Sequence, residues 1–166
     1  MATTDVVMYD EEFNQIKTIL SKLRTDANAK LVFLVDKNGQ QIAAQGEIEN
    51  LDTTSLASLT AGNVAATDGL ARLIGEKEFS ILFHEGERDN IHISIVAQRV
   101  ILVVIFDERS SLGLVRLRVK KASGELNDVF ARIMSKVEKE RAAAGAAFES
   151  PFAEITDDDI DSLFSE

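Results

Sequence analysis

Three apolar runs follow one another in the middle of the chain with very short links between them. They span residues 79–85, 91–97 and 100–106, and turn-forming residues fill the gaps. Links this short can join only antiparallel neighbours, because a parallel crossover needs about a dozen residues or more. The last run is apolar throughout, as expected of a strand buried on both faces. The sequence therefore predicts a three-stranded antiparallel meander.

A second pair of strands is predicted upstream, at residues 30–36 and 40–46. Asn38-Gly39 lies between them, and Asn-Gly is the strongest short-range signal for a β-hairpin. Asp36 opens a stretch that resembles the start of a calcium-binding loop, but the later acidic ligands and the closing Glu are missing. We interpret it as a turn. Together with the meander, the hairpin predicts a five-stranded antiparallel sheet.

Three helices are predicted around these strands. Residues 9–27 carry an apolar stripe, and residues 52–76 begin with the possible caps Asp52, Thr53 or Thr54. A long helix starts near Ser110 or Ser111, although its first residues also alternate like a strand. The order helix, two strands, helix, three strands, helix predicts an α/β (α+β) domain over residues 1–140, with helices on both faces of the sheet. Residues 141–150 are Ala-rich and predict a flexible linker, followed by a separate motif at 151–166.

Composition restricts the partners that the chain can bind. Its 166 residues have a net charge of −10 and contain no cysteine. An acidic surface disfavours nucleic acid and anionic lipid, and the absence of cysteine excludes disulfides and thiolate metal sites. No apolar run approaches the ~20 residues that a membrane-spanning helix needs, and the first residues lack the pattern of a secretory signal. We expect a cytoplasmic protein with no nucleic-acid partner and no membrane insertion.

Catalytic machinery is hard to assemble from this sequence. No Walker or GxGxxG phosphate loop is present, and the two histidines, His84 and His92, fall on predicted strands without metal-ligand spacing. Ser110 and Ser111 are better explained as helix caps than as nucleophiles. We therefore expect a binding or regulatory protein with no cofactor, no metal and no active site of its own.

The helix at 52–76 is the most informative element for function. A helical wheel centred on Leu59 places a core-facing stripe on one side, made of Leu56, Leu59, Asn63, Ala66, Leu70, Leu73 and Ile74. The other side is built mainly of small residues and includes Ala71, with Gly62 and Gly69 toward one edge. The candidate contact residues on it are Ala57, Ala61, Val64, Ala65, Asp68, Gly69 and Arg72. A helix surface bare of Lys, Glu and Gln suits close approach by a second subunit or a partner. Two alternatives remain, an Ala-rich helix favoured for its propensity and a helix enclosed within its own domain.

The end of the chain carries a second candidate contact. Three acidic residues precede Ile160, Leu163 and Phe164, which recur at helical spacing. Such a segment is too short to form a stable helix alone, but it suits binding as a helix in a partner's groove. The alternative is a disordered acidic tail.

Several segments resemble the roadblock/LC7 family, in particular its GTPase-activating members from bacterial polarity and gliding systems. The resemblance rests on residues 26–30, 32–39, 52–66, 111–118 and 150–164, and it covers essentially the whole chain.

The resemblance implies a homodimer whose two sheets join and whose second helices form one platform. It implies that a Ras-like small GTPase of the MglA type docks there in its GTP-bound form, with contact roles for Ala61, Ala65, Asp68, Gly69 and Arg72. It further implies that hydrolysis is accelerated without an arginine finger from this chain, that the tail binds a separate patch on the GTPase, and that the complex concentrates at a cell pole. The alternative is a roadblock scaffold that recruits a GTPase or motility complex without changing hydrolysis.

Overall fold

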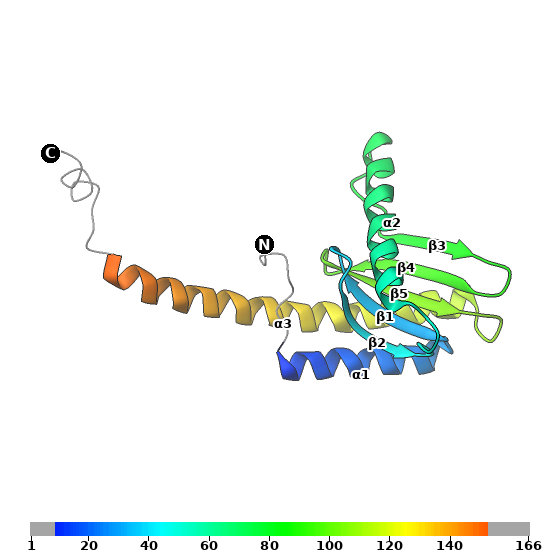
Figure 1. Cartoon of the computed structure of the whole chain (residues 1–166), viewed down its shortest axis with the longest axis horizontal. Helices are drawn as coiled ribbons and strands as arrows, with labels where there is room; N and C mark the ends of the chain where they lie inside the picture. Colours follow the sequence, from blue (N-terminus) through cyan, green and yellow to red (C-terminus); the bar gives the residue numbers. More distant parts are fainter. Residues whose placement is uncertain (1–8, 153–166) are drawn as a thin grey trace.

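The chain folds as one antiparallel sheet with helices on both faces (Figure 1). This computed structural model describes the backbone of residues 9–152 and the side chains of residues 9–145. The elements follow the predicted order: α1 (Asp10–Ala27), β1 (Leu31–Asp36), β2 (Gln41–Gly46), α2 (Thr53–Leu73), β3 (Ile81–Glu85), β4 (Asn90–Val96), β5 (Val100–Phe106) and α3 (Leu112–Phe152).

The sheet has the strand order β2-β1-β5-β4-β3, with every pair antiparallel. Two predictions are confirmed, namely the hairpin turn at Asn38-Gly39 and the burial of the strand at 100–106 on both faces. The Asp36 carboxylate accepts hydrogen bonds from the backbone N–H groups of Asn38 (2.9 Å) and Gln40 (3.0 Å), so it closes the hairpin turn. Gly39 in that turn has a φ of +90°, a conformation that favours glycine. The central strands β1 and β5 are buried on both faces, whereas β2 and β3 form the edges.

The larger core lies between the sheet and the pair of helices α1 and α3, which pack side by side (Figure 1). The apolar spacing predicted this contact, since Ile16, Leu20 and Leu23 of α1 are buried there. Ser111 begins α3 as expected of a cap, because its hydroxyl accepts a hydrogen bond from the backbone N–H of Leu114 at 3.2 Å. The buried residues of α3 in this core are Val115, Val119, Ala122, Leu126, Val129, Phe130, Ile133 and Val137.

A smaller core lies on the opposite face of the sheet, beneath α2. Phe33, Val35 and Val103 of the central strands pack there against small side chains of the helix. The N-terminus of α2 is capped by Asp52, whose carboxylate accepts hydrogen bonds from the backbone N–H (3.0 Å) and hydroxyl (2.6 Å) of Ser55. These hydrogen bonds stabilise the charged carboxylate and lower the pKa of Asp52 below its ordinary value.

The predicted flexible linker at 141–150 is wrong, because α3 continues through these residues to Phe152. Alanine has the highest helix propensity, so an Ala-rich stretch that follows an established helix extends it at little cost. Beyond Val137 the helix leaves the sheet and projects away from the body (Figure 1). The motif at Ile160, Leu163 and Phe164 lies outside the described residues. Over the described part of the chain, no helix combines the length and apolar character needed to cross a bilayer.

Candidate functional site

The candidate site is the outer surface of α2, and its geometry is set by how the helix sits on the sheet. The N-terminal half of α2 lies close to the sheet because small side chains face it. A Cβ atom on Gly39 would lie 3.3 Å from the Cα of Ser58 and 3.7 Å from the Cβ of Ala61. On the other side of the helix, the side chains of Asn63 and His84 are hydrogen-bonded at 2.8 Å, which ties α2 to the edge strand β3.

The structure reverses part of the helical-wheel assignment: some residues predicted as contacts are buried, and some predicted as core are exposed. Ala57, Ala61 and Val64, predicted as partner contacts, are 1%, 9% and 3% exposed and pack on the protein's own sheet. The prediction is wrong for these three residues because a helix that lies closely on a sheet needs small side chains between the two backbones. The alternative of a helix face enclosed within its own domain is therefore correct for this side.

The predicted core stripe is wrong for its large residues as well. Leu59, Leu70, Leu73 and Ile74 are 73%, 57%, 84% and 69% exposed. Leu56 alone among the predicted leucines packs partly against the smaller core. We call Leu59, Leu70, Leu73 and Ile74 the leucine row. Four large apolar side chains left in water on one helix are unusual, because soluble proteins rarely expose a contiguous apolar patch without using it for binding.

The remaining predicted contact residues do reach the surface. Ala65, Gly69 and Arg72 are exposed, and Gly62 lies beside them. A Cβ atom placed on Gly62 or Gly69 would meet no other atom of the described residues within 4 Å, so no contact among them requires glycine at either position. We call Gly62, Ala65, Gly69 and Arg72 the small-residue row.

Asp68 lies between the buried and exposed sides of α2 and is only partly exposed. Its Oδ1 atom is buried and has no hydrogen-bond partner among the described residues. The sequence predicted Asp68 as a surface contact, but a carboxylate oxygen turned inward is poorly placed to meet a partner. The structure therefore brings Ala65, Gly69 and Arg72 together on the surface and places Asp68 at its margin.

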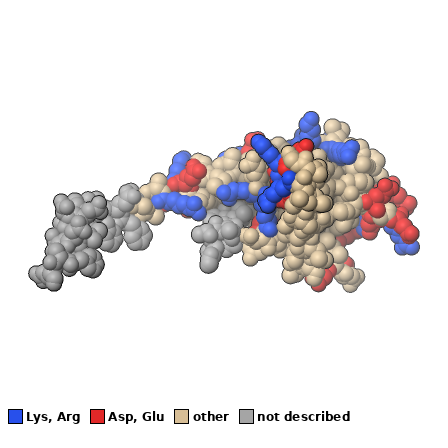
Figure 2. Space-filling view, turned by 90° about the horizontal axis from the view of Figure 1, so that it is seen from above, with Lys and Arg blue, Asp and Glu red and all other residues tan. Residues whose placement is uncertain are grey.

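The C-terminal end of α2 stands away from the sheet (Figure 1), and the residues of both rows are exposed along the helix. Figure 2, which looks onto this end of the molecule, shows a broad area without charged side chains around α2, bordered by a few basic ones. Acidic side chains gather instead at the far end, where the β3–β4 turn lies. A surface of this kind can bind another protein through apolar contact, with Arg72 as a polar contact beside it.

Chemical machinery is sparse in the described part of the chain. No group of three or more His, Asp or Glu side chains there is arranged to hold a metal ion. His92 is buried on β4 under α3, and burial followed by the nearby charge of Arg116 lowers its pKa below the ordinary value. Neither histidine is hydrogen-bonded to a serine hydroxyl among the described residues. His84 bonds to Asn63, and His92 has no hydrogen-bond partner among those residues.

Sequence reasoning missed the leucine row as a surface. One signal was available: α2 is apolar on two opposite sides, which is typical of a helix that contacts a second layer besides its own core.

Comparisons with known proteins agree with this architecture. The family model for the Roadblock/LC7 domain matches residues 15–106. A search of curated protein sequences found no match. The chain is 63% identical to the solved MglB of Myxococcus xanthus, with 76% of this chain and 96% of that chain covered and a TM-score of 0.73. It is 30% identical to the solved gliding protein MglB of Thermus thermophilus, with 77% and 97% covered and a TM-score of 0.73.

A more distant likeness concerns the fold alone. A Roadblock/LC7 domain from Streptomyces avermitilis is 11% identical, with 74% of this chain and 97% of that chain covered and a TM-score of 0.57. The match to the family model over more than half of the chain and the two MglB relatives lead to one conclusion: the chain belongs to the roadblock/LC7 family, where it groups with the MglB proteins.

Proposed function

We propose that the protein is a homodimeric regulator of a Ras-like small GTPase of the MglA type in a gliding-motility system. It binds the GTP-bound form and accelerates hydrolysis by positioning the catalytic groups that the GTPase itself carries. The observation that carries this proposal is the exposed face of α2, where large apolar side chains and bare backbone lie next to each other. The MglB relatives support a regulatory protein rather than a classical enzyme.

The leucine row suits self-association. It lies on the side of α2 that Asn63 ties to β3, and β3 is an edge strand with unpaired backbone groups. Ile81 on that strand is 52% exposed on the α3 face of the sheet, so the edge strand carries exposed apolar surface of its own. A second copy of the chain placed against both elements would bury the leucines and extend the sheet.

The small-residue row suits docking of the GTPase. It lies on the exposed flank of α2 beside the leucine row, and its lack of large side chains lets another backbone approach closely. Two copies of α2 side by side would present two such rows as one platform. A partner held there in its active conformation hydrolyses GTP faster if its own Arg and Gln are then correctly placed, and no arginine need come from the regulator.

Phosphate release tests this mechanism. The protein is mixed with its GTPase loaded with GTP, and the variants Ala65→Arg and Gly69→Arg are compared with wild type. We expect both variants to fold normally and to lose GTPase binding, because a bulky cation then occupies the platform. Gly124→Arg is the matched control. Gly124 is also a helical glycine at which an added Cβ atom would meet no other described atom within 4 Å, but it lies on α3.

Wild-type affinity in Ala65→Arg and Gly69→Arg would remove the small-residue row from the interface. If wild-type protein binds the GTPase but phosphate release stays at its basal rate, the protein is a scaffold rather than an activator.

Self-association is tested separately by sedimentation equilibrium. Leu73→Lys should shift the protein from dimer to monomer, because it places a charge within the leucine row. Leu117→Lys is the matched control, since Leu117 on α3 is 62% exposed but lies away from α2. An unchanged dimer in Leu73→Lys would show that the subunits meet elsewhere.

A further inference from the structure

The sheet has two edge strands, and the dimer proposed above uses only β3. The opposite edge strand, β2, lies beside α1 and carries no charged residue and no proline along Gln41–Gly46 (Figure 1). Proteins usually protect an exposed edge with such residues, because its free backbone groups otherwise pair with another chain. The β2 edge therefore suits strand addition, and it remains open in the monomer and in the proposed dimer alike.

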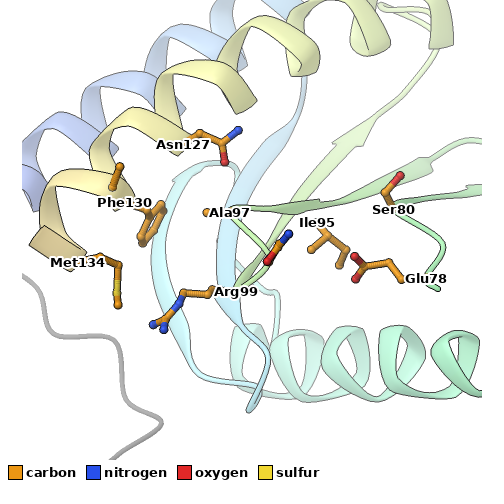
Figure 3. Close-up of a pocket in the computed structure, with 10 residues that line it drawn as sticks. Glu78, Ser80, Ile95, Ala97, Arg99, Asn127, Phe130 and Met134 are labelled. Carbon is orange, nitrogen blue, oxygen red and sulfur yellow. The ribbon is translucent and has the colours of Figure 1, made fainter.

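A cavity of about 490 Å³ near the β4–β5 turn is less selective. Phe130 and Met134 of α3 give it an apolar wall, while Arg99 and Glu78 place opposite charges on its rim (Figure 3). That combination favours no single class of occupant. The β2 edge differs, because its backbone direction and its neighbouring charges both restrict what can bind.

The backbone of β2 directs every second residue toward the open edge. The N–H of Glu47 donates a hydrogen bond to the carbonyl of Lys30 at 2.9 Å, which makes Gly46 and its partner on β1 a non-hydrogen-bonded pair. The two kinds of pair alternate along an antiparallel ladder, so Ala44 and its partner form the next pair of this kind. A bulge interrupts the ladder at Ile42. Ala44 therefore points its N–H and C=O groups away from β1.

The flank of α1 beside this edge is basic. A Cβ atom on Gly46 would lie 2.9 Å from Nε of Arg24, and Lys17 and Ser21 line a shallow groove of about 520 Å³ together with Gln45 of β2. Lys17 and Arg24 take part in none of the ion pairs within the described residues. A chain added to β2 would thus meet two cations that are free to pair with it.

We propose that the β2 edge binds an extended, acidic segment of a partner protein by β-strand addition. The segment pairs with Ala44 through its backbone, and every second side chain lies over α1. Carboxylates at those positions pair with the cations of α1. Asp26 and Glu47 stand at the same end of the edge as Arg24, so the strongest preference for a carboxylate is expected beside Lys17.

A second copy of the chain is a less suitable occupant. Pairing of two β2 strands would bring the Lys17 flank of one α1 next to that of the other, so like charges would meet. Combined with the proposed dimer, such pairing would also use both edges of every sheet and produce an open array of subunits. The experiment below separates this occupant from a partner's segment.

Two synthetic peptides test the proposal on the full-length protein. One alternates Glu with Val over about seven residues, the length of an ordinary strand, and the other alternates Gln with Val. Both carry fluorescein, and binding is followed by fluorescence anisotropy. We expect the Glu peptide to bind about threefold more tightly than the Gln peptide. The net charge of −10 on the protein opposes this order, so nonspecific attraction does not explain it.

Two variants separate the backbone contact from the charge contact. Ala44→Pro removes the N–H that faces the open edge and leaves the ladder to β1 intact, so it should weaken both peptides by about fivefold or more. Lys17→Glu leaves the backbone unchanged and should abolish the preference for the Glu peptide. Lys22→Glu is the matched control, because it makes the same charge change on the flank of α1 that faces Arg118 of α3, and it should keep the preference.

The results that overturn the proposal are equally specific. They are the absence of binding by either peptide, equal binding of both peptides, or a preference that survives in Lys17→Glu as it does in Lys22→Glu. Sedimentation equilibrium supplies a further test. A lower mass for Ala44→Pro than for wild type would also overturn the proposal, because the edge would then join a second copy of the chain.

Discussion

His92 provides the sharpest test of the packing between α3 and the sheet. It lies on β4, paired in register with Phe83 and Val104, and is 1% exposed. Neither ring nitrogen has a hydrogen-bond partner among the described residues. The buried hydroxyl of Ser94, two residues further along the strand, also has none among them. An imidazole enclosed in this way resists protonation, and its pKa is lowered by burial first and by the charge of Arg116 second.

The sign of the pH dependence follows from this lowered pKa. Unfolded chains bind a proton at His92 near the ordinary pKa of about 6.5, whereas the folded protein does not until the pH is lower. Protons therefore favour the unfolded state, and the free energy of unfolding falls as the pH drops below about 6.5. The limiting slope for one group is about 1.4 kcal/mol per pH unit, which is the upper bound on the stability lost for each unit by which the pH falls. Above about pH 7.5 the group contributes no pH dependence.

Replacing His92 by Leu removes the titrating group and both unpaired nitrogens. We expect the stability of His92→Leu to depend less on pH than that of wild type, so that the difference between their free energies of unfolding widens as the pH falls below about 6.5, by no more than about 1.4 kcal/mol per pH unit. Urea unfolding followed by far-UV circular dichroism at fixed protein concentration measures this difference. Ser94→Ala, which removes the other unpartnered polar group on this face of β4 and keeps His92, is the control and should keep the pH profile of wild type. Parallel pH profiles for wild type and His92→Leu would refute the reasoning.

Further predictions concern the turn, α2 and the end of the chain. Asp36→Ala should lower the free energy of unfolding by about 1–3 kcal/mol, measured by urea denaturation, because two backbone N–H groups lose a buried acceptor. Gly69→Ala should raise it by up to about 1 kcal/mol in the same assay while weakening GTPase binding, because a methyl group fits within the chain but occupies the small-residue row. Arg72→Ala should weaken binding, measured by titration calorimetry, yet leave the phosphate-release rate of the saturated complex unchanged, since we propose that no arginine is supplied. Truncation after Arg141 should retain some stimulation of hydrolysis and shorten the lifetime of the complex; an indistinguishable truncated protein would reduce the tail to a spacer.

The sheet and the α1–α3 layer could be predicted because each follows from local pattern. Asn38-Gly39 sets one turn, the short links after Glu85 and Val96 force antiparallel pairing, and the stripe from Val115 to Val137 has one possible burial site. In these elements hydrophobic periodicity and turn chemistry indicate the same structure, so tertiary packing had nothing to override.

The orientation of α2 could not be predicted in the same way. A helical wheel assigns the larger apolar side chains to the core. Here the small side chains of Ala57 and Ala61 pack on the sheet, and Leu70 and Leu73 are exposed. The rule assumes that a chain buries its largest apolar groups against itself. It fails for a helix whose other apolar side is available to a second molecule, and that side is the candidate site.

The end of α3 was misjudged for a different reason. Ala-rich sequence with a glycine is typical of both linkers and helices, and composition alone does not distinguish them. Continuation from a long, well-packed helix decides the outcome, because propagating an existing helix avoids the cost of nucleation.

The extension of α3 changes how the final residues of the chain can act. Phe152 lies fifteen residues after Val137, which is about 22 Å of helix. A flexible tether of that length would let its end sample the surface from which it emerges, whereas a helical rod carries its end outward in one direction. A partner of the last residues would then be bound at a fixed distance from the sheet. Removing two turns of helix would shorten that distance by about 11 Å and leave the direction of the helix axis nearly unchanged. The protein would thus select its second contact by distance as well as by chemistry.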